Sequence, residues 1–531
     1  MSVGEALRGK AVGAVARARL ARLAQAVVRQ APQPHGAPVV FFNASTRLWG
    51  LSQNAAFQWL TAWSLRLQGV PVVQFVCQAG MPRCVLGTDP DRLHQPPPCD
   101  LCQAWSRRLY RGLPVRGFAY TPDADLDVAL EAQSVTALET FVHRGVPLGA
   151  LTLPSVRWRL RRHNLHDDEA TRALYRDFIR GAWQVARAFG VLLDEVQPQA
   201  VVVFNGQFFP EATARWVAQQ RGVRVITHEV GLRPLTAFFT EGEATAYPIY
   251  IPEDFDLTPE QNTRLDAYLS RRFQGDFTMA GIRFWPEMRG LDAAFLERAA
   301  RFRGIVPVFT NVVFDTSQPH ANTLFPHMFA WLDALLDLIR VHPDILFVIR
   351  AHPDEMRPGK AARESVRDWV ESRAVQSLPN VHFVDAQEYL SSYDLIRRAK
   401  FVMVYNSTIG LEATLLGKAV VSAGRARYTQ YPTVYYPASV MAYLDLVERF
   451  LNAPGEIPAP GGHRRHARRF LYYQLYKVSL PFEAFLEPYP RQQGYVRLKS
   501  FPVEHLLPEY SETMRVLREG VLSGAPFVLP E

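Results

Sequence analysis

The sequence predicts a two-domain α/β protein in which each domain is a parallel sheet covered by helices on both faces. Three observations carry this prediction. Short apolar runs alternate with amphipathic stretches in both halves of the chain, a pattern typical of βαβ units. The chain has 531 residues, too many for one ordinary core. Small polar residues follow several apolar runs, where a doubly wound sheet meets its ligand. We therefore expect two doubly wound domains that face a cleft, with C-terminal helices packing back.

The clearest βαβ unit lies in the second half of the chain. The apolar run Phe401–Tyr405 predicts a buried strand, and Gly410–Leu416 predicts a helix that Gly417 ends. The run Ala419–Ala423 predicts the next strand. Small polar residues fill the turn between the first strand and the helix, and the free N–H groups of a helix start favour an anion. This unit therefore predicts a phosphate-binding turn.

The first half of the chain repeats this organisation. We expect a strand over Ala200–Phe204, a turn over Asn205–Pro210, a helix over Glu211–Gln220 and a strand over Val223–Thr227. The patterns together divide the chain into five parts. These are a basic N-terminal helix (1–36), an N-terminal Rossmann-like domain with a four-cysteine insertion (37–245), a linking segment (246–303), a C-terminal Rossmann-like domain (304–450) and a helical tail (451–531).

Charge and composition indicate a globular protein with anionic partners. The chain is 48% hydrophobic and 21% charged, and 59 Lys and Arg against 51 Asp and Glu give a net charge of +8. It has no uninterrupted run of about 18 apolar residues and no apolar signal-peptide core at its start, so we expect a cytoplasmic protein. We expect no nucleic-acid partner.

The first 30 residues predict a basic helix. Arg22 and Arg29 share one face, whereas Leu20, Leu23 and Val27 share another. The pattern fits a solvated surface helix, and it also fits a foot on an anionic membrane surface. Peripheral contact with the inner face of the cytoplasmic membrane is therefore an expectation for this segment.

All four cysteines lie in one proline-rich window of the N-terminal domain. They are Cys77, Cys84, Cys99 and Cys102, the last two in the sequence "CDLC". Four thiolates suit one tetrahedral structural zinc, although six residues between the first two is a wide spacing. Unliganded thiols remain an alternative, as do disulfides or redox chemistry, which a reducing compartment disfavours. A catalytic role is not expected, because no base or resolving partner is evident.

Polar turns after predicted strands mark the lining of the cleft. On the N-terminal side they are Asn205–Glu211 and His228–Gly231. On the C-terminal side they are Asn311–Ser317, Arg350–Glu355 and Asn406–Glu412. Any one of these turns could use its polar residues merely as caps. Five such turns together favour a ligand site.

Two of these motifs resemble a known family. The sequence "RAHPDE", followed downstream by "VYNSTIGLEATLLGKAVV", resembles bacterial capsule and surface-polysaccharide glycosyltransferases of the GT-B fold, and among them Kdo-transferase-like proteins. The resemblance covers roughly Ala200 to Tyr436 and is looser in the N-terminal third. It implies an N-terminal acceptor domain and a C-terminal domain that binds a nucleotide-sugar donor.

The chemistry of sugar transfer then assigns roles to the C-terminal turns. The leaving nucleotide is anionic, so the site must stabilise developing negative charge. His352 is expected to act on the departing phosphate, and the carboxylate of Glu412 is expected to accept hydrogen bonds from ribose. The alternative for Glu412 is an ordinary first-turn glutamate, and for His352 a hydrogen-bonded strand-end histidine. The expected donor-binding residues are Arg350, Asn406, Ser407, Thr408, Gly410 and Glu412.

The acceptor hydroxyl must lose a proton to a base on the opposite domain. Glu229 is the expected general base, with a structural cap or ion pair as the alternative role and His228 as its rival. Glu211 is expected to be a cap-region carboxylate. Asp315 is expected either to contact donor or sugar or to be a plain turn residue.

Three functional classes remain open from the sequence. The first is a glycosyltransferase acting on a surface glycan or glycolipid, with CMP-Kdo as the first donor guess from the resemblance. The second is a glycerol- or ribitol-phosphate transferase of teichoic-acid type, and the third is a nucleotide-binding scaffold without catalysis. A nucleotide-sugar 2-epimerase is a further enzymatic possibility. No Asp-x-Asp motif is placed convincingly, so metal-independent transfer is expected.

Overall fold

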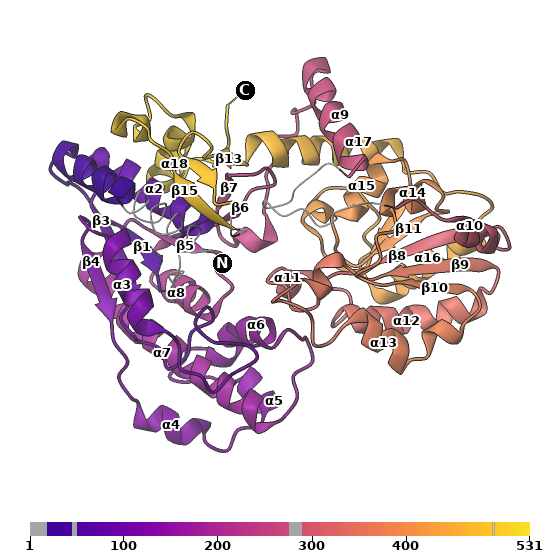
Figure 1. The fold of residues 1–531 in the computed structure, drawn as a ribbon, viewed down its shortest axis with the longest axis horizontal. Helices are drawn as coiled ribbons and strands as arrows, with labels where there is room; N and C mark the ends of the chain where they lie inside the picture. Colours follow the sequence, from indigo (N-terminus) through magenta and orange to yellow (C-terminus); the bar gives the residue numbers. More distant parts are fainter. Residues whose placement is uncertain (1–17, 45–49, 276–288, 491, 493, 531) are drawn as a thin grey trace, which may run out of the picture.

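The computed structural model describes residues 18–44, 50–275, 289–490, 492 and 494–530 (Figure 1). The start of the predicted basic helix, at residues 1–17, and part of the predicted linking segment, at 276–288, lie outside the described residues. Within the described part, no helix combines the length and apolar character needed to cross a membrane.

The N-terminal domain is built on a seven-stranded sheet. Its order is β13-β7-β6-β5-β1-β3-β4, and the five strands from β6 to β4 run parallel, whereas β7 and β13 are antiparallel additions. The strands are β1 (Val39–Asn43), β3 (Val72–Cys77), β4 (Val115–Phe118), β5 (Ala200–Phe204), β6 (Arg224–Val230), β7 (Thr236–Glu241) and β13 (Leu480–Pro481). The chain leaves β1 in one direction and later returns to its other side, which makes the sheet doubly wound.

Alternating side chains bury both faces of this sheet, as expected for a parallel sheet. Val39 and Phe41 of β1 point into one core, and Val40 and Phe42 point into the other. The first core is covered by α2, α18 and the helix at residues 18–30, and the second by α6, α7 and α8. The labelled α-helices of the N-terminal domain, apart from those of the tail, are α2 (Gln53–Leu67), α3 (Cys99–Leu109), α4 (Ala124–Leu130), α5 (Val135–Glu139), α6 (Leu148–Leu160), α7 (Glu169–Val196) and α8 (Phe209–Gln220).

The C-terminal domain contains a five-stranded, wholly parallel sheet of order β10-β9-β8-β11-β12. β8 lies in the middle, with the chain winding first to β9 and β10 and then to β11 and β12, so the topological switch falls between β8 and β11. The strands are β8 (Gly304–Phe309), β9 (Ile345–Arg350), β10 (Val381–Val384), β11 (Val402–Val404) and β12 (Val420–Ser422). Its α-helices are α10 (Ala293–Ala299), α11 (Gln318–Ala321), α12 (Met328–Val341), α13 (Val366–Ser372), α14 (Ser392–Arg397), α15 (Ile409–Leu415) and α16 (Val440–Asn452). These two sheets confirm the predicted fold class.

Short helical turns connect several of these elements. They are η1 (Ala244–Ala246), η2 (Pro353–Met356), η3 (Val375–Ser377), η4 (Arg427–Gln430), the π-helical η5 (Tyr473–Lys477) and η6 (Val503–Leu506). α9 (Pro259–Phe273) lies between the two domains in sequence, and a capping box of Thr258 and Gln261 starts it.

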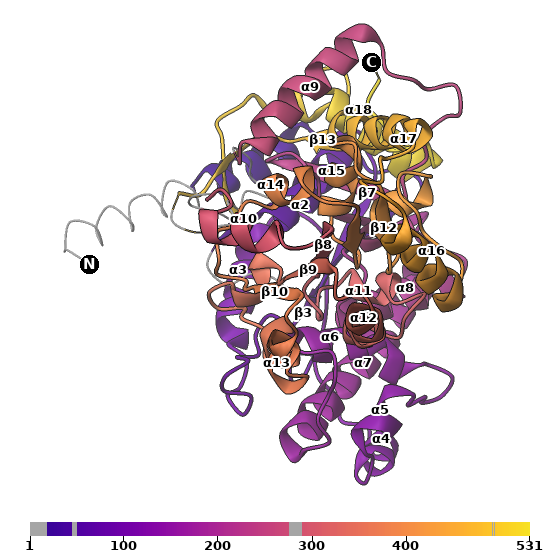
Figure 2. The ribbon, with the colours of Figure 1, turned by 90° about the vertical axis from the view of Figure 1, so that its right-hand side faces the viewer.

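The C-terminal tail spans both domains. Its helix α17 (Gly461–Tyr472) packs near α9 and α15, and η5 carries the chain to β13, which pairs with β7 of the N-terminal sheet. A small antiparallel sheet follows, in which β14 (Leu486–Pro488) and β15 (Tyr495–Leu498) join β2 (Leu51–Ser52). The final helix α18 (Glu512–Ser523) packs on α2. Figure 2 shows α9, α17 and α18 at the end of the molecule opposite α4 and α5.

Three features of this fold differ from the sequence prediction. The tail was predicted as helical but also contributes strands, and β7 was not predicted. β6 continues to Val230, so His228 and Glu229 lie within a strand rather than after it.

Candidate functional site

A cavity of about 290 Å³ lies between the two domains. The C-terminal domain contributes the segments that follow β8, β9, β11 and β12. The N-terminal side contributes Trp158 of α6 together with Thr245 and Ala246 of η1. The cavity therefore lies beyond the carboxyl ends of a parallel sheet, the place where doubly wound sheets bind ligands.

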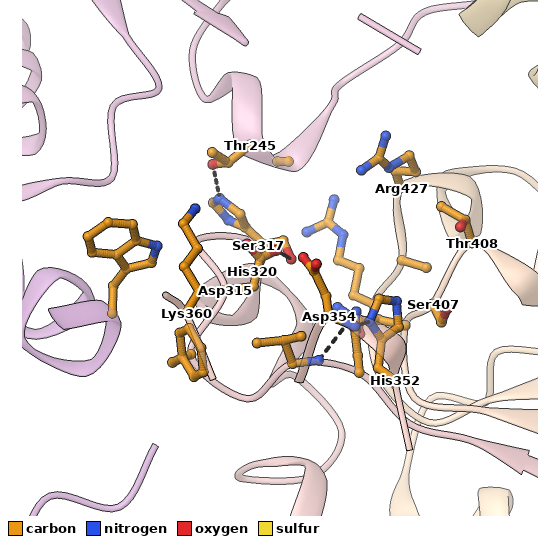
Figure 3. Close-up of a pocket in the computed structure, with 18 of the residues that line it drawn as sticks. Thr245, Asp315, Ser317, His320, His352, Asp354, Lys360, Ser407, Thr408 and Arg427 are labelled. Carbon is orange, nitrogen blue, oxygen red and sulfur yellow. Dashed lines mark hydrogen bonds between the residues drawn. The ribbon is translucent and has the colours of Figure 1, made fainter. Parts of the chain in front are cut away.

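Several predicted site residues line this cavity. His352, Asn406, Ser407 and Thr408 do so, and all follow C-terminal strands (Figure 3). Asn406 accepts a hydrogen bond from the side-chain amide of Asn311, with 2.7 Å between Nδ2 and Oδ1. That bond ties the segment after β11 to the segment after β8, so the two sides of the topological switch form one polar surface.

His352 has a defined hydrogen-bonding state. The backbone N–H of Asp354 donates to Nδ1 of His352 at 3.2 Å, so the neutral ring carries its proton on Nε2. Burial lowers the pKa of His352 below its ordinary value, against the opposing effect of Asp354 and Asp315. At neutral pH His352 is therefore an uncharged ring with an Nε2–H donor.

Four cationic side chains also line the cavity, and sequence reasoning missed them. They are Arg357, Lys360, Arg425 and Arg427, against the carboxylates Asp315 and Asp354. In Figure 3, Lys360 and Arg427 lie at opposite ends of the site with Asp354 between them. Arg425 and Arg427 come directly after β12, so the rule that drew attention to the other strand-end turns could have found them. The cationic excess favours an anionic ligand.

Two of these cations are held by aromatic rings from the other side of the cavity. The Arg427 guanidinium lies 3.9 Å from the ring centre of Tyr247, and the Lys360 ammonium lies 5.3 Å from that of Trp158. His320 adds a further cross-cavity contact, with 2.8 Å between its Nε2 and Oγ1 of Thr245. Ligand-facing charges on the C-terminal domain are thus positioned partly by the N-terminal side.

Three predicted donor-binding residues do not line the cavity. Arg350, at the end of β9, is only 3% exposed, and burial lowers the pKa of its guanidinium to about 10. Arg350 and His352 are two positions apart, so an extended chain would place both side chains on one face. The strand instead ends at Arg350, so only His352 reaches the cavity.

Glu412 and Gly410 lie on the inner side of α15. Arg272 of α9 donates to Oε1 of Glu412 from Nε at 2.9 Å and from Nη2 at 2.5 Å, and Tyr393 donates to Oε2 at 2.6 Å. A Cβ on Gly410 would come within 2.3 Å of the Tyr428 hydroxyl oxygen. The structure thus engages Glu412 in a buried ion pair and places Gly410 against Tyr428. Neither residue faces the cavity.

The predicted base, Glu229, lies in β6 close to the cavity but is not part of its lining. Asn205 donates to its Oε2 at 2.8 Å, and the N–H of Val230 donates to its Oε1 at 2.9 Å. Burial raises the pKa of Glu229 and the charge of Asp315 raises it further, whereas the two hydrogen bonds lower it. Asp315 itself is exposed in the cavity. The base role of Glu229 stays a prediction, with Asp315 as a second candidate.

The rival base, His228, is fully buried. Its ring stacks on Phe239 with 5.0 Å between ring centres and lies 5.7 Å from Phe204. Neither ring nitrogen has a hydrogen-bond partner among the described residues, and burial lowers its pKa to about 3. Glu211 is also buried, in the first turn of α8.

The four cysteines are half-buried around the start of α3. Gly80 donates its N–H to Sγ of Cys77 and Gly87 donates to Sγ of Cys84, each at 3.2 Å, and α3 begins at Cys99. Burial raises the pKa of the Cys77 and Cys84 thiols to about 12. In the described part of the chain, no three His, Cys, Asp or Glu side chains are arranged to hold a metal ion. Structural zinc stays a prediction.

The two domains also touch at the rim of the cavity, through the 357–365 loop that carries Arg357 and Lys360. The Glu364 carboxylate accepts hydrogen bonds from the backbone N–H groups of His163 and Asn164, at 2.8 and 2.9 Å, and from the Asn164 amide. Asp91, between the first and second cysteine pairs, accepts from Arg161 and from Arg363, each at 2.6 Å. We call these contacts the rim clasp.

The apolar face of the helix at residues 18–30 is not free. Leu20, Leu23 and Val27 are buried in the N-terminal core. This part of the predicted basic helix therefore docks on its own domain through the residues that were candidates for a membrane foot.

Comparison with known proteins agrees with the resemblance found in the sequence. Residues 287–431 match the family model for capsule polysaccharide biosynthesis protein, which confirms the resemblance over that part of the chain. Protein FixF of Sinorhizobium fredii is 28% identical over 147 residues, which are 26% of this chain and 33% of FixF. The matched region thus spans about a third of the length of FixF.

Two solved structures show weak overall similarity. KpsC of Thermosulfurimonas dismutans, described as a beta Kdo 2,4 transferase, gives a TM-score of 0.34 at 14% identity, over 58% of this chain and 87% of that one. A UDP-GlcNAc 2-epimerase from Neisseria meningitidis gives 0.26 at 13% identity, over 82% and 99%. At these scores neither likeness carries an inference about activity.

Proposed function

We propose that this protein is a glycosyltransferase of surface-polysaccharide biosynthesis, which moves a sugar from a nucleotide-sugar donor to a glycan or glycolipid acceptor. The observation that carries the proposal is the interdomain cavity itself. It lies at the carboxyl ends of parallel strands and combines four cations with hydroxyl, amide and imidazole groups. The capsule-family match over residues 287–431 covers the segments that form most of its lining.

The cation count favours a donor with more than one negative group. Arg357, Lys360, Arg425 and Arg427 exceed the two lining carboxylates by two charges. CMP-Kdo, the first donor guess from the sequence resemblance, carries one phosphate and one sugar carboxylate and would match that excess. These fixed cations would also supply the countercharge for a leaving phosphate, so we propose metal-independent transfer.

Roles follow from the positions of the polar groups. The hydroxyls of Ser407 and Thr408 and the guanidinium of Arg427 would hold the phosphate. The neutral His352 would donate from Nε2 to a phosphate oxygen and so stabilise the departing nucleotide. As the bond from the anomeric carbon to phosphate breaks, the acceptor oxygen bonds to that carbon and its proton passes to a carboxylate. Glu229 is proposed as that base, and Asp315 is the alternative because it lines the cavity.

The test is a donor assay with two separate readouts. The protein is incubated with CMP-Kdo and a panel of other nucleotide sugars, with and without EDTA, and both free nucleotide and labelled glycan are measured. His352→Ala should weaken donor binding and slow transfer together, whereas Glu229→Gln should keep donor binding and slow transfer by about 10²–10⁴-fold. Asp337→Asn, an exposed carboxylate on α12, is the matched control and should change neither.

Each alternative function predicts a different result. A phosphodiester in the product would identify a phosphate transferase of teichoic-acid type, and an epimer formed without acceptor would identify a 2-epimerase. Tight nucleotide binding without turnover across the panel would contradict the enzyme proposal and leave a binding protein. If His352→Ala binds and transfers like the wild type, the proposed donor site is wrong.

A further inference from the structure

Positive charge is concentrated at the start of this chain. Residues 6–118 contain 14 Lys and Arg against three Asp, a net charge of +11, whereas the whole chain carries only +8. The remaining residues are therefore net acidic. Charge this uneven indicates a surface that meets a polyanion, and the question is where it lies in the fold.

Part of this charge lies at the outer edge of the N-terminal sheet. We define the β4-edge surface by Arg107, Arg108, Arg111 and Arg116 with Leu101 and Val115, which lie on α3, on β4 and between them. β4 is the terminal strand of the sheet, and Figure 1 shows α3 and β4 together at the margin farthest from the C-terminal domain. The surface is thus remote from the interdomain cavity.

The arginines of this surface are unengaged, unlike most others in the protein. All four are exposed, and within the described residues none of their side chains forms a hydrogen bond or ion pair. The acidic residues nearby in sequence are mostly occupied, because Asp89 pairs with Arg92 and Asp91 belongs to the rim clasp. Asp100 lies at the opposite end of α3. Four charges kept free on one edge favour an external anionic partner.

Apolar side chains project among these charges. Leu101 is 46% exposed and Val115 is 43% exposed, and Leu101 lies seven residues from Arg108, on the same helical face. The helix at residues 18–30 adjoins this surface, since a Cβ on Gly112 would come within 2.9 Å of Val28. Val28 is itself 50% exposed and precedes the exposed Arg29. Arginines interleaved with protruding aliphatic residues fit the headgroup region of a membrane, where charge meets lipid phosphate and aliphatic groups enter the acyl boundary.

We propose that the β4-edge surface docks the protein on an anionic lipid membrane. A soluble anionic glycan is the less favoured partner, because the exposed aliphatic side chains of Leu101 and Val115 would gain little from contact with a hydrated sugar chain. Docking through this edge would leave the interdomain cavity, on the other side of the N-terminal domain, open to donor and acceptor. The proposal concerns location and does not depend on the catalytic roles given above.

The experiment is vesicle flotation with the full chain. Vesicles of phosphatidylcholine alone are compared with vesicles containing about 30 mol% phosphatidylglycerol, an anionic content that gives a strong surface potential. The wild type should float only with the anionic vesicles and should be released at about 0.5 M salt, where the screening length is a few ångströms. Each arginine near such a surface contributes about fivefold in affinity. Four such losses multiply, so replacing all four by Gln should raise the lipid concentration for half-binding by about 10²–10³-fold.

A control variant separates the effect of this surface from the effect of the protein's net charge. Arg301, Arg340, Arg373 and Arg397 are exposed arginines of the C-terminal domain, and replacing them by Gln removes the same charge. That variant should float like the wild type. The double variant Leu101→Ser, Val115→Ser should lose part of its binding and become more sensitive to salt. Circular dichroism checks the fold of each, and R108Q/R111Q alone serves if the fourfold variant misfolds.

Three outcomes would overturn the proposal. The first is a wild type that does not float with anionic vesicles at low salt. The second is equal loss in the β4-edge and control variants, which would mean nonspecific adsorption. The third is binding to soluble alginate that the β4-edge variant abolishes, with no vesicle binding, which would identify a polysaccharide surface instead.

Discussion

Among the described residues, the ion pair between Glu412 and Arg272 is the most deeply buried pair of opposite charges. Both side chains are only 6% exposed, and Tyr393 and Tyr268 complete their hydrogen bonds. Removing one member of a buried pair leaves the other charged and desolvated. Glu412 is thus expected to hold α9 against α15, which is a structural role.

Glu412→Ala should lower the free energy of unfolding by about 3–5 kcal/mol, because Arg272 loses its countercharge. Denaturant unfolding of the purified protein measures this. The double variant Arg272→Met, Glu412→Leu should recover most of the loss and should bind nucleotide normally by calorimetry. A stable Glu412→Ala protein with weakened nucleotide binding would instead restore the ribose role that the sequence suggested.

Glu229 offers a test by pH. Its pKa lies above the ordinary value of 4.5, and catalysis by a general base needs the ionised carboxylate. The rate of transfer should therefore fall as pH decreases through this raised pKa. Asp315→Asn removes a negative neighbour, so it should shift this acid limb to lower pH with little loss at the plateau. If Asp315→Asn instead abolishes transfer at every pH, Asp315 is the base.

At the scale of elements, the local sequence pattern was sufficient to predict a strand and the turn after it wherever neither depends on a segment distant in the chain. β5 has the predicted bounds, and β11, α15 and β12 appear where the unit from Phe401 to Ala423 was expected. His352, Ser407 and Thr408 reach the cavity for the same reason. The pattern failed where the partner is remote in sequence. Arg272 lies 140 residues before Glu412, and β13 of the tail is a strand only because it pairs with β7 of the N-terminal sheet.

The cysteine window is the element whose chemistry is most open to test. Two thiols accept N–H bonds from glycines three residues ahead, and the other two lie in the first turn of α3. If they take up structural zinc, protein purified without chelator should contain about one equivalent, and Cys99→Ser with Cys102→Ser should lose it and melt at lower temperature. Less than about a tenth of an equivalent, with all four thiols titrating freely, would rule out a stable site.

At the scale of the whole molecule, the rim clasp couples the domains. Glu364 accepts two backbone N–H bonds from the opposite domain, and the 357–365 loop that carries it also carries two cavity cations. Bonds to a charged acceptor are each stronger than neutral ones, although partial exposure reduces their net value. We therefore expect the clasp to oppose separation of the two domains at the cavity.

Glu364→Gln keeps the shape of the side chain but removes its charge. Hydrogen exchange of the His163 and Asn164 amides should accelerate by about tenfold, the equivalent of roughly 1.4 kcal/mol, and the KM for donor should rise more than kcat falls. Glu371→Gln, an exposed residue of α13 that pairs within its own domain, is the control. Unchanged exchange of these two amides would show that the clasp contributes nothing to closure.

The tail has a further consequence, for the order in which the protein is made. β7 receives its outer partner only from Leu480 and Pro481, and α2 receives its cover from α18, near the end of the chain. A ribosome therefore completes the C-terminal sheet before the N-terminal sheet has its full set of strands. The domain that is synthesised first is finished last, and a message truncated after residue 450 would encode a complete second sheet beside an unfinished first one.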